Sequence, residues 1–161
     1  MVFLGVLMSA LVLSSAASAK TSKYCSVLSG HDVGRPLGIS SLRVQSVTVK
    51  FPSVARGNGR VTLCTLSTPA DSVAETSVAK CTSATGARNE FAAIIHRERK
   101  SVRAKKTSGP WTDAYFLQQD GFLTLKGRYM FHIQYASGAQ NYSHITPKVL
   151  AGLAAKAVKS L

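Results

Sequence analysis

Alternating apolar and polar residues predict a three-stranded antiparallel meander between Trp111 and Tyr135. Asp120-Gly121 predicts a type I′ turn after the first strand, because both central residues of that turn need a positive φ. Gly127-Arg128 separates the second strand from the third, which covers residues 129–135 and alternates cleanly. One face of the meander should pack, whereas the other should be wetter and open to a ligand. The wetter face is expected to carry Thr124, Lys126, His132 and Gln134.

Further periodic segments predict three more strands and three helices. The strands are expected over residues 42–51, 60–68 and 76–84, with a short helix over residues 71–80 as the alternative to the third strand. The helices are expected directly after Ser29, from Ala87 to Val102, and from Pro147 to Leu161, where Thr146 is a natural N-cap. Residues 105–110 are expected to form a loop. Together these segments predict an α+β domain, in which an antiparallel sheet including the C-terminal meander is covered by helices on one face.

The first residues have the pattern of a secretory leader. Residues 2–13 form an apolar run that is too short to span a bilayer, and Ala17-Ser18-Ala19 follows as a small-residue cleavage site. We therefore expect a signal peptide over residues 1–19, cleaved after Ala19, and a single α+β domain over residues 20–161. The expected location is secreted or periplasmic, without a transmembrane segment in the mature chain.

The chain is strongly basic, with 20 Lys and Arg against 7 Asp and Glu and a formal net charge of +13. Such a surface can attract an anionic polymer, an anionic membrane surface or a protein partner, and it can attract nucleic acid only without sequence specificity. The alternative is that the charge merely keeps the domain soluble. The densest cluster, which is the expected binding site, comprises Arg97, Arg99, Lys100, Arg103, Lys105 and Lys106.

The chain has three cysteines, and two alternative disulfide pairings fit the predicted elements. If the second and third strands form a hairpin symmetric about Ser72-Val73, Cys64 and Cys81 stand opposite each other. The competing pair joins Cys25 to Cys64 and ties the N-terminal helix to the sheet. No Cys-x-x-Cys or similar ligand spacing occurs, so we expect neither a metal site nor a cofactor.

Catalytic signatures are missing from the sequence: there is no Gly-x-Ser-x-Gly and no His-Glu-x-x-His. The favoured hypothesis is a noncatalytic binding domain. The alternative is a basic secreted nuclease, because two histidines and one cation suffice for phosphodiester transfer. Its best candidate is His132, with His31 or His144 as the partner.

The order of several short motifs resembles that of the small exported lipoprotein-type domains of unknown function common in actinobacteria. The matching segments are Tyr24-Cys25-Ser26-Val27-Leu28-Ser29, Cys64-Thr65, Gly109-Pro110-Trp111-Thr112-Asp113-Ala114-Tyr115-Phe116, the Lys126-Gly127 turn and the Ala-rich end from Leu150 to Leu161. The resemblance implies an antiparallel sheet covered by helices on one side, a disulfide between Cys25 and Cys64, and Cys81 as the extra cysteine. The chain departs from that family in lacking a lipobox and in its high positive charge.

Overall fold

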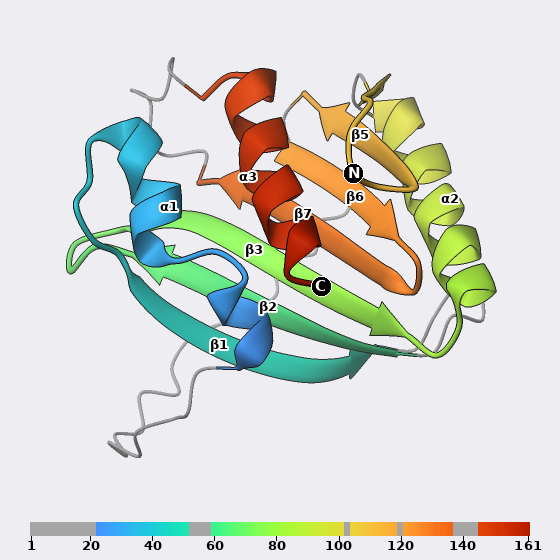
Figure 1. The fold of residues 1–161 in the computed structure, drawn as a ribbon, viewed down its shortest axis with the longest axis horizontal. Coiled ribbons are helices and arrows are strands. Elements are labelled where there is room, and N and C mark those ends of the chain that lie inside the picture. Colours follow the sequence, from blue (N-terminus) through green and yellow to red (C-terminus); the bar gives the residue numbers. More distant parts are fainter. Residues whose placement is uncertain (1–21, 52–58, 102–103, 119–120, 137–144) are drawn as a thin grey trace, which may run out of the picture.

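The computed structural model describes residues 22–51, 59–101, 104–118, 121–136 and 145–161. They form one antiparallel sheet of seven strands in the order β1-β2-β3-β7-β6-β5-β4 (Figure 1). The strands are β1 (Arg43–Phe51), β2 (Gly59–Ser67), β3 (Ser72–Cys81), β4 (Ala104–Lys106), β5 (Asp113–Leu117), β6 (Gly121–Lys126) and β7 (Tyr129–Tyr135). The helices are η1 (Lys23–Ser26), α1 (Gly30–Gly34), η2 (Arg35–Leu37), α2 (Ala84–Ser101) and α3 (Pro147–Lys159). The predicted α+β class and the antiparallel meander are confirmed.

Helices cover both faces of the sheet, so the prediction of cover on one face is wrong. In β6 the neighbouring residues Phe122 and Leu123 point to opposite faces, and both are buried. Phe122 packs in a core with α1 and α3, whereas Leu123 packs in a second core with α2. A strand that is apolar on both faces needs cover on both. We call these two sides the α3 face and the α2 face.

The α3 face is fixed by helix caps and by bonds between distant segments. Ser29 and Asp32 form a capping box at the start of α1, and the Thr146 hydroxyl accepts a hydrogen bond from the Val149 N–H at the start of α3. The two helices are joined by an ion pair between Lys156 Nζ and Asp32 Oδ1. The Tyr135 hydroxyl donates to the Val33 carbonyl at 2.8 Å, which ties β7 to α1. The predicted helix starts at Ser29 and Thr146 are therefore confirmed.

The disulfide joins Cys25 of η1 to Cys64 of β2, with 5.6 Å between the Cα atoms. The alternative pair of Cys64 with Cys81 is wrong, because the β2–β3 hairpin turns earlier than predicted. Cys64 lies opposite Thr76, and Cys81 lies opposite Gly59 at the far end of the ladder. The helix alternative for residues 71–80 is also wrong, because residues 72–80 belong to β3, which pairs with β2 and β7. Cys81 is a free thiol buried on the α2 face.

Two local predictions concern the surroundings of the meander. The loop expected over residues 105–110 is only partly a loop, because Lys105 and Lys106 belong to β4 and pair with β5. Gly121 begins β6 with φ of 89°, and a Cβ there would collide with the Ile133 carbonyl oxygen, so glycine is required. Asp120 and the leader over residues 1–19 lie outside the described residues.

Candidate functional site

A basic pocket of about 430 Å³ lies between α2 and the strands β5 and β6. Apolar side chains of both elements form its floor, and Arg88, His96 and Arg99 approach it from α2. Clefts that combine an apolar floor with a few placed polar groups are the usual form of ligand sites. The lining residues are Arg88, Phe91, Ala92, Ile95, His96, Arg99, Thr112, Asp113, Tyr115 and Leu125.

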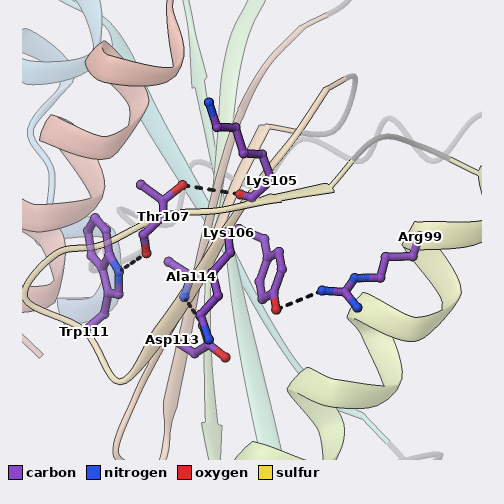
Figure 2. A network of polar contacts seen from close by, with 8 residues as sticks. Arg99, Lys105, Lys106, Thr107, Trp111, Asp113 and Ala114 are labelled. Atoms are coloured by element: carbon purple, nitrogen blue, oxygen red, sulfur yellow. Dashed lines mark hydrogen bonds and ion pairs between the residues drawn. The ribbon is translucent and has the colours of Figure 1, made fainter.

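Arg99 is held in this pocket by Tyr115 of β5. Its Nη2 donates a hydrogen bond to the Tyr115 hydroxyl at 3.1 Å, and its guanidinium carbon lies 5.2 Å from the centre of the ring (Figure 2). The Tyr115 ring is buried and leans on Phe91 of α2, with 6.1 Å between the ring centres. The hydroxyl and the ring of Tyr115 therefore both hold the Arg99 guanidinium, and Tyr115 is itself fixed by the core. The tyrosine hydroxyl uses one of the five guanidinium N–H groups.

Lys106 of β4 lies beside the pocket and makes an ion pair with Asp113, with 3.2 Å between Nζ and Oδ1. Asp113 also accepts a hydrogen bond from the Ala114 N–H at 3.0 Å, which holds its carboxylate against the strand (Figure 2). The pocket with its rim thus carries three cationic side chains, those of Arg88, Arg99 and Lys106, and one carboxylate. An arrangement with excess positive charge and forked donors suits carboxylate, sulfate or phosphate groups.

The structure divides the predicted basic cluster between different surfaces. Arg97 lies on the other side of α2, where it pairs with Glu98 at 3.3 Å. Lys105 and Lys106 point in opposite directions from β4 (Figure 2). Of the predicted set, Arg99 and Lys106 are the members placed at the pocket. The side chain of Lys100 and all of Arg103 lie outside the described parts of the chain.

Sequence reasoning missed two residues of this pocket as site residues, Arg88 and His96. Their signal is present in the sequence, because positions 88, 92, 96 and 99 recur at the spacing of one helix face. Counting charges along the chain hides this spacing. Arg97 and Arg99 are neighbours in sequence but lie on opposite sides of the helix.

His132 lies on the α2 face, half-buried beneath α2 rather than on an open surface. It lines two adjoining hollows of about 230 and 300 Å³, which also share Ser77, Ile94 and Leu123. Two of the residues predicted to share its face are on the α3 face instead. Thr124 is fully buried there, and Lys126 Nζ donates to the Val158 carbonyl of α3 at 2.7 Å. The prediction is therefore wrong for Thr124 and Lys126, whereas His132 and Gln134 do share the α2 face, where α2 partly covers His132.

The predicted histidine pairs are not assembled by the described residues. His31 belongs to α1 on the α3 face and is exposed, so the sheet lies between it and His132. His144 lies outside the described residues. Arg97 and Glu90 line the hollow of about 230 Å³ together with His132.

Burial raises the pKa of the Cys81 thiol, and the nearby Glu90 carboxylate raises it further. A thiol with a raised pKa is a poor nucleophile at neutral pH. Cys81 is therefore a packing residue of the second core. Within the described ranges, no three His, Cys, Asp or Glu side chains gather closely enough to hold a metal ion.

Comparison with protein-family models, curated proteins and solved structures finds no match to this chain. In the residues that the structure describes, no helix combines the length and the apolar character needed to cross a membrane.

Proposed function

We propose that this chain is a noncatalytic, exported domain that binds an anionic surface polymer through the basic pocket between α2 and β5. The export step rests on the leader-like residues 1–19 and agrees with the disulfide between Cys25 and Cys64, since disulfides persist in oxidising compartments. The observation that carries the binding site is Arg99, held over Tyr115 in a pocket that also contains Arg88 and His96.

The pocket favours a repeating polymer over a small anion. Its volume of about 430 Å³ is of the size that takes one sugar unit or similar group, and Lys106 extends the charge beyond its rim. The net charge of +13 adds a long-range attraction that guides a polyanion to the surface. Contacts of this kind follow charge and do not read sequence.

Retention on immobilised heparin in a salt gradient tests this proposal. Arg88→Gln with Arg99→Gln removes two charges at the pocket, and Lys148→Gln with Lys159→Gln removes two exposed charges from α3 as a matched control. We expect the pocket variant to elute at clearly lower salt than the α3 variant. If both variants elute together, the retention reflects net charge alone and the pocket is not a polyanion site.

A second candidate, a secreted nuclease, is favoured by one observation. His132, Glu90 and Arg97 line the same hollow, which places an acid–base pair and a cation around one space. The test is cleavage of single-stranded RNA by the purified protein and by its His132→Ala variant. Cleavage that disappears in the variant would establish the nuclease. Absence of turnover in the native protein would exclude it.

A further inference from the structure

The sheet has two edges of very different length. β4 ends one edge with three residues, whereas β1 ends the other with nine, Arg43–Phe51, and pairs with β2 alone. In an antiparallel sheet, about half of the N–H and C=O groups of an edge strand point outward, away from its neighbour. Among the described elements, none pairs with the outer side of β1, which lies along the lower margin of Figure 1.

An exposed apolar patch adjoins this edge on the α2 face. Val47 of β1 and Leu63 of β2 are opposite each other in the ladder, with 56% and 46% of their surfaces exposed. The cover that α2 provides reaches Val61, which packs against the second core, and the two exposed residues lie beyond it. A strand added beside β1 would bring its own alternate side chains next to Val47 and cover it.

The positive charge of β1 and β2 indicates which kind of partner this edge can bind. Between them, β1 and β2 contain Arg43, Lys50 and Arg60 and no Asp or Glu. Arg60 is exposed and, by strand alternation, lies on the opposite face from Leu63. A second copy of this basic chain would bring like charges together, whereas an acidic strand would be attracted.

We propose that β1 binds an extended, acidic segment of a partner protein, which joins the sheet as an additional strand. Backbone hydrogen bonds along β1 supply the affinity of such an addition, and alternate side chains supply its selectivity. The segment places apolar residues beside Val47, which lies next to Leu63 on the α2 face, and acidic residues on the face that carries Arg60. This site is separate from the pocket at Arg99 and uses no residue of it.

The probe for this site is a synthetic eight-residue peptide that alternates Val and Glu, with capped ends. Its control is the same peptide with Lys in place of Glu. Hydrogen–deuterium exchange of the full-length protein locates the bound peptide, and calorimetry measures its affinity. We expect saturable binding of the acidic peptide with slowed exchange in residues 43–51, and no binding of the basic peptide.

Two matched variants make the test specific. Val47→Asp places a carboxylate in the middle of the edge, and Ser108→Asp makes the same charge change at an exposed loop position after β4. We expect at least tenfold weaker binding for Val47→Asp and less than a twofold change for Ser108→Asp. The inference is overturned if the acidic peptide shows no saturable binding at millimolar concentration, or if it protects α2 and β5 instead of β1. It is also overturned if sedimentation shows that the edge is already occupied by a second copy.

Discussion

The two faces of the sheet are covered to very different extents. On the α3 face, η1, α1 and α3 pack on one continuous core that runs from β2 across to β5, and a disulfide and an ion pair hold these helices in place. On the α2 face, α2 is the single helix that covers the sheet among the residues that the structure describes (Figure 1). One helix is too narrow for seven strands, so this face keeps a basic pocket, two hollows and an exposed apolar patch.

This difference in cover indicates that the two faces have different roles, one in stability and one in binding. The features that hold the fold together lie on the α3 face, where buried aromatic residues such as Phe122 and Phe131 fill the core. Within the described residues, the pocket at Arg99, the two hollows at His132 and the exposed patch at Val47 lie on the α2 face or at its margin. Function is often placed where cover is incomplete, because a fully packed face has no surface left to offer.

The largest contrast is expected between core truncations on the two faces. Phe131→Ala on the α3 face should lower the free energy of unfolding by about 3–5 kcal/mol, since Phe131 is fully buried. Leu123→Ala on the α2 face should cost less, near the low end of about 2–5 kcal/mol, because Leu123 already borders two hollows. Urea unfolding of both variants measures the difference. Equal losses would mean that the two cores are packed equally well.

Loss of the disulfide should have the next largest effect. Replacing both Cys25 and Cys64 by Ser should lower the free energy of unfolding by about 2–4 kcal/mol, because the bridge closes a loop with a sequence separation of 39. The comparison is made in a Cys81→Ala background so that no free thiol can exchange. An unchanged urea midpoint in the double variant would show that packing alone holds η1 on the α3 face.

The local patterns in the sequence predicted the well-covered parts of this fold. The alternation in residues 129–135 and the caps at Ser29 and Thr146 depend on near neighbours, and all three are confirmed. The β2–β3 ladder is centred on Ala70, between two and three residues before the predicted centre at Ser72-Val73. That small error changed the register, and with it the partner of Cys64 that strand geometry alone suggested. The motif resemblance implied the pair with Cys25 that the structure contains.

The candidate pocket was harder to predict, because it depends on which elements meet. The charge count around Arg97 found Arg99 and Lys106, but strand pairing brings Lys106 to Asp113 and helix packing brings Arg99 to Tyr115. Neither contact has a signal in residue spacing. The cover over His132 was missed for a related reason. The apolar run of β6 on both of its faces already indicated that the second face is covered as well.

The ion pair on the α3 face should make that face sensitive to acid. The hydrogen bond from Lys156 is the main reason that the pKa of Asp32 is lowered from 3.8 to about 2. A carboxyl whose folded pKa is lowered stabilises the fold above its unfolded pKa, and this stabilisation is lost as the pH falls from about 4 to about 2. Water screens this exposed pair, so Lys156→Met should cost no more than about 1 kcal/mol at pH 7, and the difference from wild type should shrink across that interval.

The measurement for this ion pair is urea unfolding at a series of pH values. Lys148→Met is the matched control on the same helix, because Lys148 is exposed and removes the same charge. A Lys148→Met variant with the same pH-dependent loss would show that net charge, rather than the bond to Asp32, is responsible.

The smallest loss of stability is expected at the margin of the α2 face, where apolar side chains are exposed to solvent rather than packed. Leu63→Thr keeps a residue that favours strands, and it should change the free energy of unfolding by no more than about 0.5 kcal/mol, since the Leu63 side chain is nearly half exposed. Leu66→Thr, three residues further along β2 and buried on the α3 face, should cost several times more, on the order of 2 kcal/mol or above. Urea unfolding of the two variants gives the ratio of the two losses in stability.

A small loss at Leu63 means that this apolar surface does not stabilise the isolated domain, as a surface kept for a partner requires. A loss at Leu63 as large as that at Leu66 would place Leu63 in the core and remove the apolar patch beside β1 on which strand addition depends.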